Sequence, residues 1–209
     1  MNSKTYSQYS QDLFLVSALF ADKKNGIFVD IGANDGITYS NTLLLEELGW
    51  TGVCIEPIKS SFDKLVACRK CECINSTISS HLSEFVEFCE ISGYSEMLSG
   101  IIEDYDERHK QRILHELQLY GGTKTKIEIK NYRFCDIIKY PQIDIVCIDT
   151  EGSELSVLNS IDFDNVKINY FLVENNYGDE KISKFMNNQN YKFIKQFGSD
   201  ELYENTILF

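Results

Sequence analysis

Residues Asn25–Gly36 read NGIFVDIGANDG, an apolar run that ends at an acidic residue and then turns through glycines. Ile27–Ile31 is β-branched or aromatic except for Asp30, which suits a strand buried on both faces of a parallel sheet. Gly32 and Gly36 allow the backbone to turn tightly and to approach a ligand closely. The stretch therefore predicts a strand followed by a ligand-binding turn.

A helix is expected directly after this turn. Thr38–Leu48 carries apolar residues at helical spacing, and Thr38, Ser40 and Asn41 are its candidate N-caps. In a strand, glycine turn and helix of this kind, backbone N–H groups and the helix N-terminus face a nucleotide-type cofactor.

The spacing within the turn distinguishes between cofactors. Gly32–Gly36 reads GANDG, so the dinucleotide fingerprint G-x-G-x-x-G fails. Together with Asp30 the segment fits D-x-G-x-N-x-G, a form of the S-adenosylmethionine loop in which Asn34 stands at the middle glycine. Asn tolerates the left-handed conformation better than other non-glycine residues, so the replacement is physically reasonable.

A second acidic residue is expected beside the same ligand. Thr51–Glu56 reads TGVCIE and precedes Pro57, so Glu56 stands at the tip of a second predicted strand. A carboxylate there can accept both hydrogen bonds of a ribose diol. Asp30 or Glu56 alone could be a solvated strand-end acid, but the two together favour cofactor binding.

A third apolar run ends in several carboxylates. Ile143–Glu154 reads IDIVCIDTEGSE and delivers Asp149, Glu151 and Glu154 to the carboxyl end of a buried parallel strand, where ligands of such sheets bind. Carboxylates this close repel one another unless a cation or a substrate hydroxyl is present. Alternatively, some of them cap the following predicted helix, Glu154–Ile161. For Asp149 we favour a functional role.

Length and composition limit the classes of protein. The 209 residues, 43% of them hydrophobic, are enough for one domain with a sizeable core. A net charge of -12 argues against a nucleic-acid partner. No apolar run approaches a bilayer span, and Leu13–Ala21 lacks the basic flank of a secretory signal. The 7 scattered cysteines suit a reducing compartment, so we expect a cytoplasmic protein.

The remaining chain alternates between predicted helices and strands. Capping groups in Tyr6–Asp12 precede a first helix, and Lys167–Glu174 reads as a further parallel strand. Other predicted helices are Ser60–Cys68, Asp104–Leu119 and Asp179–Asn188; other strands are Glu72–Ile78, Glu84–Ile91, Lys124–Tyr132 and a terminal hairpin of Tyr191–Phe197 with Glu201–Phe209. We expect His109 and His115 to be solvated on a surface helix.

Leu82–Asn131 is the least regular part of this alternation. Within it, Tyr94–Gly100 is small and polar enough to form a loop over the site, which makes Ser99 a candidate acceptor contact. We therefore expect a single domain over residues 1–209, with substrate specificity inserted at 82–131.

A cysteine cluster raises the alternative of a zinc site. Cys68, Cys71 and Cys73 lie close in sequence, and His81 is the only nearby candidate for a fourth ligand. A second pair at the spacing of structural zinc sites is missing, so ordinary thiols are the preferred interpretation.

Seven short segments, in this order, resemble the FkbM-type family of S-adenosylmethionine-dependent methyltransferases over nearly the whole chain. They are SQYSQD (7–12), VDIGANDG (29–36), SNT (40–42), LGWTGVCIEP (48–57), LSGI (98–101), IDTEGSE (148–154) and VENNY (173–177). The expected fold is α/β, a Rossmann-like class I methyltransferase fold with a seven-stranded mostly parallel sheet, a C-terminal antiparallel hairpin and helices on both faces. The resemblance also implies O-methylation, commonly of sugar hydroxyls in glycans or natural products.

The resemblance makes Gln8, Ser10 and Gln11 candidates for holding the methionine end of the cofactor, beyond a role in capping. Independently of the resemblance, Asn75, Ser76 and Thr77 form the polar exit of the predicted strand Glu72–Ile78, where they either contact an adenine edge or only end the strand. The full set of candidate cofactor contacts is Gln8, Ser10, Gln11, Asp30, Gly32, Asn34, Asp35, Gly36, Asn41, Thr42, Glu56, Pro57, Ser76, Thr77 and Asp149.

The chemistry of methyl transfer suggests a role for each of the predicted carboxylates. A methyl group on positive sulfur needs a well-positioned nucleophile, and a hydroxyl needs either a carboxylate base or a bound Mg²⁺. We expect Asp149 to be the base or a metal ligand. Glu151 and Glu174 would orient the acceptor or complete a Mg²⁺ site, and Glu154 and Asn175 would contact the acceptor.

Two other functions are kept open. An NAD(P)-dependent oxidoreductase is disfavoured by the missing G-x-G-x-x-G. The other alternative is a cofactor-binding module without turnover, as one domain of a larger glycan-building polypeptide. The expected partner is a small-molecule or glycan acceptor.

Overall fold

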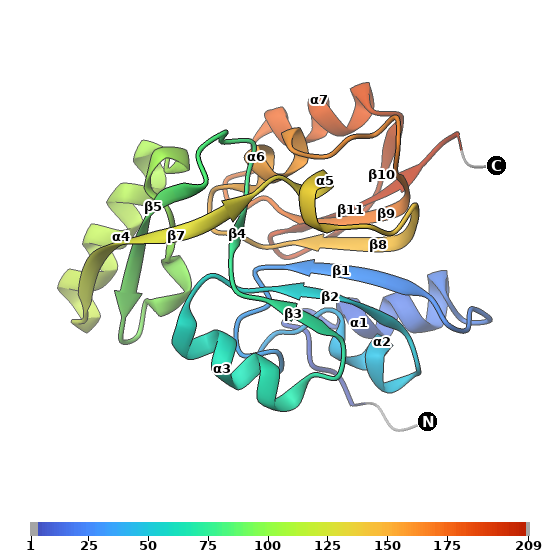
Figure 1. Ribbon diagram of the computed structural model, residues 1–209, viewed down its shortest axis with the longest axis horizontal. Coiled ribbons are helices and arrows are strands. Elements are labelled where there is room, and N and C mark those ends of the chain that lie inside the picture. The colour runs from blue at the N-terminus through green and yellow to red at the C-terminus, as the bar shows by residue number, and fades with distance from the viewer. Residues whose placement is uncertain (1–3, 208–209) are drawn as a thin grey trace.

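The computed structural model describes residues 4–207, and its central feature is a seven-stranded sheet (Figure 1). The strand order is β10-β11-β9-β8-β1-β2-β3. The strands are β1 (Ile27–Ile31), β2 (Thr51–Ile55), β3 (Glu72–Ile74), β8 (Gln142–Ile148), β9 (Lys167–Glu174), β10 (Tyr191–Phe197) and β11 (Asp200–Asn205). Neighbours from β9 to β3 run parallel, and β11 is antiparallel to both β9 and β10. The predicted sheet with its terminal hairpin is confirmed.

Helices cover both faces of this sheet because successive strand side chains point to opposite sides. Val29 packs in a core formed with α5 (Phe134–Ile137), α6 (Glu154–Asn159) and α7 (Glu180–Asn188). Phe28 packs in the opposite core, formed with α2 (Leu43–Glu47), α3 (Lys59–Cys68) and the π-helix Leu15–Leu19 that continues α1 (Gln11–Phe14). Both cores are apolar, which explains the nearly uninterrupted apolar runs in the central strands.

A second, smaller sheet stands beside the main one (Figure 1). Its order is β4-β7-β5-β6, and α4 (Glu107–Tyr120) packs with it. Its strands are β4 (Thr77–Ile78), β5 (Phe85–Ser92), β6 (Gly100–Ile101) and β7 (Thr123–Tyr132), with 3-10 helices at Glu96–Leu98 and Ile102–Asp104. Glu84–Ile91, expected as the fourth strand, therefore pairs outside the main sheet.

Two predicted elements are divided or shortened. The strand expected over Glu72–Ile78 splits, because Asn75 Nδ2 donates to the carbonyl oxygens of Glu56 (2.8 Å) and Pro57 (2.9 Å) and the chain then crosses to the second sheet. The helix expected from Thr38 begins only at Leu43, where Ser40 Oγ accepts a bond from the Leu43 N–H at 3.1 Å.

The prediction of a solvated His109 is wrong. Its side chain is 1% exposed, and Nε2 lies 3.1 Å from the Leu98 carbonyl oxygen. The residues of the alternative zinc site do not gather within the described chain: Cys71 Sγ lies 3.5 Å from Cys54 Sγ, whereas His81 Nε2 contacts Asp104 Oδ1 at 2.8 Å. Over residues 4–207, no helix has the length and apolar character needed to cross a bilayer.

Candidate active site

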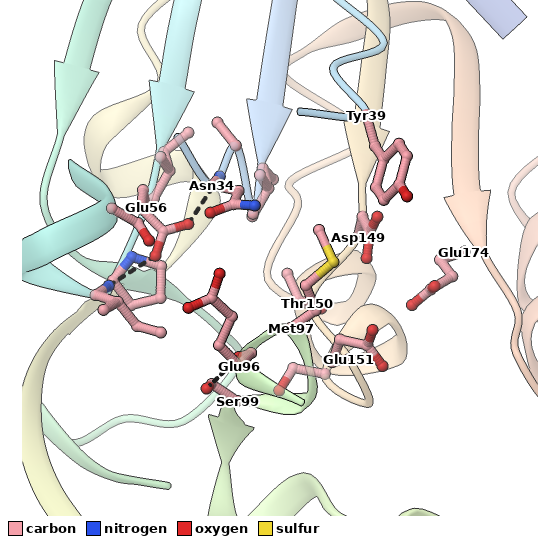
Figure 2. A pocket seen from close by; sticks show the side chains of 18 of the residues that line it. Asn34, Tyr39, Glu56, Glu96, Met97, Ser99, Asp149, Thr150, Glu151 and Glu174 are labelled. Atoms are coloured by element: carbon pink, nitrogen blue, oxygen red, sulfur yellow. Dashed lines mark hydrogen bonds between the residues drawn. The ribbon is translucent and has the colours of Figure 1, made fainter. Parts of the chain in front are cut away.

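A cavity of about 400 Å³ lies where the carboxyl ends of β1, β2, β8 and β9 face the second sheet. This volume is within the range typical of small-molecule sites. Figure 2 shows Asn34 and Glu56 on one side of the cavity and Asp149, Glu151 and Glu174 on the other. The side chains predicted from separate strand ends therefore meet around one space.

The turn after β1 is tightly held against its neighbours. Gly32 and Asn34 have positive φ angles of 89° and 49°, as the glycine-like role of Asn34 requires. The N–H groups of Gly32 and Ala33 both donate to the Ile55 carbonyl oxygen at 3.0 Å. A Cβ on Gly32 would lie 1.7 Å from the Asp149 carbonyl oxygen, so no side chain fits there.

Glu56 follows β2 and is fixed by backbone donors. Its carboxylate accepts bonds from the N–H of Asn34 (2.9 Å) and of Ile58 (2.7 Å), and the residue is 5% exposed. Burial raises the pKa of Glu56 to about 7. The two backbone hydrogen bonds lower this pKa, and the charges of Asp30 and Asp35 raise it further. Each oxygen still has a lone pair for a ribose hydroxyl.

Asp30 has a more structural environment than the sequence suggested. Thr42 Oγ1 donates to its carboxylate at 2.5 Å, and Arg69, 6% exposed, donates to Thr42 Oγ1 at 2.9 Å. Burial raises the pKa of Asp30, and the nearby positive charge of Arg69 opposes the rise. Arg69 also bonds Glu46 at 2.7 Å, which ties α3 to α2 beneath the turn.

Some buried polar atoms of residues in the cavity wall have no protein partner within the described chain. Ser76 Oγ and Asn41 Oδ1 are buried and make no hydrogen bond within residues 4–207. Thr77 Oγ1, in contrast, already bonds Asn131 Oδ1 at 3.0 Å. Orphaned buried polar atoms in a cavity wall fit a ligand with its own polar edge, such as an adenine.

Three carboxylates converge on the side of the cavity opposite Asn34 and Glu56 (Figure 2). Asp149 follows β8, Glu151 lies two residues later with φ 54°, and Glu174 ends β9. One carboxylate oxygen from each lies within 4.8 Å of the others (Figure 2). Asn176 Nδ2 donates to Glu151 Oε2 at 3.2 Å, and the Arg112 guanidinium lies 3.8 Å from the same oxygen.

These carboxylates perturb one another. The Asp149 side chain is exposed to the open cavity, but the protein atoms crowded around it, and then the charges of Asp200 and Glu154, raise its pKa. Enclosure and the neighbouring charges also raise the pKa of Glu174 and of Glu151 well above the usual range. Glu174 Oε2 is buried and has no hydrogen-bond partner within the described chain. The cluster therefore favours binding of a proton or a cation.

The structure places the candidate residues in three groups. Lining the cavity are Gln8, Gln11, Asp30, Gly32, Asn34, Asn41, Glu56, Pro57, Ser76, Thr77, Ser99, Asp149, Glu151 and Glu174. Ser10, Asp35, Gly36 and Thr42 are not in its wall, and Asp35 instead accepts bonds from the N–H groups of Ile37 and Thr38.

Glu154 and Asn175 form the third group, which lines a second cavity. Glu154 Oε1 accepts bonds from the N–H groups of Thr150 (3.1 Å) and Gly152 (2.9 Å), so it supports the loop that carries Asp149. Asn175 Nδ2 donates to Glu201 Oε1 at 2.9 Å. Both side chains are used in holding loops of the protein.

Sequence reasoning missed several residues in the cavity wall. Asp200, Arg112, Glu96 and Tyr39 all line it. Asp200 begins β11 directly opposite Glu174 in the β9–β11 pairing, and this contact depends on strand pairing that no local motif reveals. Arg112 comes from α4, which the sequence identified only as a charged surface helix.

One family model matches most of the chain. The model of the methyltransferase FkbM domain matches residues 30–193. No curated protein matches the chain. Among solved structures, a TehB-like S-adenosylmethionine-dependent methyltransferase from Corynebacterium glutamicum is 7% identical with a TM-score of 0.49, covering 94% of this chain and 88% of its own. A precorrin-6y C5,15-methyltransferase from Geobacter metallireducens is 9% identical with a TM-score of 0.48, covering 97% and 89%.

Proposed function

The chain belongs to the FkbM methyltransferase domain family, and from this premise we propose that it transfers a methyl group from S-adenosylmethionine to a hydroxyl group of a sugar, in a glycan or a glycosylated natural product. The observation that carries the proposal is the placement of Asp149. Its carboxylate faces the same cavity as the glycine turn, and its carbonyl oxygen touches Gly32. A candidate base thus stands directly beside the candidate cofactor site.

Residues of the first half of the chain would hold the cofactor. The backbone turn at Gly32 and Asn34 and the carboxylate of Glu56 suit the ribose, and the unpartnered Ser76 Oγ and Asn41 Oδ1 suit polar groups of the ligand. When bound, S-adenosylmethionine supplies a methyl group activated by a positively charged sulfur. Much of the rate acceleration can then come from positioning alone.

Asp149 would act on the acceptor. A sugar hydroxyl is a weak nucleophile at neutral pH, so its proton must leave as its oxygen bonds to the methyl carbon. Asp149 accepts that proton, while Glu151 and Glu174 orient the hydroxyl from the adjacent walls. The raised pKa of Asp149 makes it a stronger base than a solvated aspartate.

We also propose that Asp149, Glu151 and Glu174 can hold a divalent cation such as Mg²⁺. Their oxygens lie within 4.8 Å of one another, and the unpartnered Glu174 Oε2 is available to a ligand. Hard cations prefer carboxylate oxygens. A bound Mg²⁺ would lower the pKa of the acceptor hydroxyl, and these side chains would position the ion.

The charge of the chain bears on the acceptor. Its net charge of -12 and the acidic side chains around the cavity favour a neutral acceptor over a nucleic acid. Residues of the segment 82–131 that line the cavity include Glu96 in the 3-10 helix Glu96–Leu98, Ser99 directly after it, and Arg112 in α4. Residues 82–131 are therefore proposed to select the acceptor.

The test uses methyl-labelled S-adenosylmethionine with a panel of mono- and oligosaccharides, small phenols and transfer RNA. We expect label in a sugar as an alkali-stable methyl ether, and labelling at least about 100-fold slower after Asp149→Asn. Label found only in RNA, or on nitrogen or carbon, would overturn the proposed acceptor. Tight cofactor binding without transfer to any class would instead favour a non-catalytic module.

A further inference from the structure

We propose that Asp200 binds the α-ammonium group of S-adenosylmethionine and that Gln11 positions the carboxylate of Asp200. The inference rests on the proposed function, since it concerns the same cofactor. Both residues lie outside the segment matched by the family model, residues 30–193, so the match itself says nothing about them.

The cofactor carries an ammonium group at its methionine end, so a carboxylate with an uncompensated charge is the natural partner. Asp30 is a poor candidate, because the Arg69 guanidinium already lies beside it and Thr42 Oγ1 donates to it at 2.5 Å. Glu56 lies across the cavity from Asp149 (Figure 2), and its carboxylate already accepts hydrogen bonds from two backbone N–H groups.

Asp200 meets the requirement. It is 8% exposed and lines the cavity. Gln11 Nε2 donates to Oδ2 at 2.6 Å, and Ser199 Oγ donates to Oδ1 at 3.1 Å. Both donors are neutral, so they fix the carboxylate without cancelling its charge. A buried carboxylate held in this way gains most from a cationic ligand.

Gln11 is itself held rigidly. It is 1% exposed, and its Oε1 accepts a bond from the Tyr9 N–H at 2.7 Å, which directs Nε2 toward Asp200. The segment is anchored by Asp12, 0% exposed, whose carboxylate accepts bonds from the Tyr6 N–H and Ser7 Oγ, each at 2.7 Å. The hydrogen bonds within Tyr6–Asp12 therefore also position a group in the cavity wall.

The position of Asp200 also suits this role. The β9–β11 register places it opposite Glu174, beside the carboxylates assigned to methyl transfer. Gln8, Gln11 and Ser199 complete the wall on that side. The methionine end of the cofactor would thus be held next to the reacting centre by a residue of the terminal hairpin.

The experiment is calorimetric titration of wild type and Asp200→Asn with two ligands: S-adenosylhomocysteine and its analogue in which a hydroxyl replaces the α-amino group. We expect the variant to lose about tenfold or more in affinity for S-adenosylhomocysteine and to bind the hydroxyl analogue like wild type. Exposed Asp164→Asn is the control, expected to bind both ligands unchanged.

Equal losses for both ligands, or no loss, would overturn the inference while leaving the proposed function intact. Failure of wild type to bind S-adenosylhomocysteine would overturn the proposed function. If Asp200→Asn does not fold, Gln11→Met serves instead, because it keeps the carboxylate but removes its positioning donor. Gln11→Met should also lower the affinity for S-adenosylhomocysteine more than the affinity for the hydroxyl analogue. Equal losses of affinity for the two ligands would again contradict the inference.

Discussion

Gly32 and Asp149 touch through their backbones: a Cβ added to Gly32 would lie 1.7 Å from the carbonyl oxygen of Asp149. The turn proposed to hold the cofactor and the loop that carries the proposed base therefore rest directly on each other. Asp149 N also donates to the Ile31 carbonyl oxygen at 3.0 Å, immediately before the turn. The relative position of the two functional loops is fixed by main-chain contact.

Gly32→Ala should be strongly destabilising. Gly32 (φ 89°) and Gly49 (φ 92°) have nearly the same backbone conformation, but nothing lies within 4 Å of a Cβ at Gly49. Gly49→Ala should therefore cost only the left-handed strain, about 1 kcal/mol. Gly32→Ala should cost about 2 kcal/mol more because of the clash. Urea unfolding measures both; equal losses would contradict the contact.

Asp149→Asn should separate binding from catalysis. Removal of a general base typically costs about 100-fold or more in rate, whereas contacts of the cofactor with the glycine turn and Glu56 remain. We expect kcat to fall by this factor and the Kd for S-adenosylhomocysteine to change little. Asp164→Asn, an exposed acid, is the matched control. Unchanged turnover in Asp149→Asn would exclude it as the base.

Mg²⁺ should bind at the carboxylate cluster. Binding of Mg²⁺ is expected to stabilise the fold, because an ion bound only by the native state shifts the unfolding equilibrium. The thermal midpoint of wild type should rise with Mg²⁺ and return after EDTA, and Glu174→Gln should reduce the rise. A rise of the same size in Glu174→Gln would place the ion elsewhere.

Binding of the ribose should depend on the ionisation of Glu56. Its pKa is about 7 in the free protein because of burial and of the charges of Asp30 and Asp35. Both hydroxyls of a diol can donate to the two oxygens of Glu56 only when its carboxyl group is ionised, so affinity should fall about tenfold from pH 8 to pH 6. The probe is 5′-methylthioadenosine, which has the ribose but lacks the methionine end. Glu56→Gln should flatten this dependence, and an unchanged slope would exclude Glu56 as its source.

Because the pKa of Glu56 is raised in the folded protein, Glu56 should make the stability of the fold depend on pH. A carboxyl whose pKa is higher in the folded state than in the unfolded chain favours folding in its protonated form. The contribution of Glu56 is therefore complete below its unfolded pKa and is lost as the pH rises through about 7. Chemical denaturation of wild type and Glu56→Gln at pH 5 and pH 8 would measure this loss, because the other carboxyls titrate in both proteins. The same pH dependence of stability in the two proteins would contradict it.

The strand ends of the site could be predicted from sequence because each is a short apolar run that stops at an acid. Asp30 and Glu174 lie in the last residues of β1 and β9, and Glu56 and Asp149 directly follow β2 and β8. The carboxyl ends of these parallel strands share one edge of the sheet. The cavity forms at that edge. Local sequence was sufficient here because the strand and its functional residue are adjacent in the chain.

Other features depend on contacts that local sequence does not encode. The second sheet requires Phe85–Ser92 to pair with Thr123–Tyr132, across a helix. Thr42 turns inward because Asp30 and Arg69 lie beneath it, so it supports the site from behind. Asp200 reaches the cavity only through the pairing of the terminal hairpin with β9.

Calorimetric titration of wild type with S-adenosylhomocysteine, with NAD as the comparison ligand and with Mg²⁺ or EDTA present, tests the central claim most directly. We predict saturable binding of S-adenosylhomocysteine in the micromolar range and no binding of NAD. Folded protein that binds no S-adenosylhomocysteine in any of these conditions would contradict the account and would leave the glycine turn to another ligand.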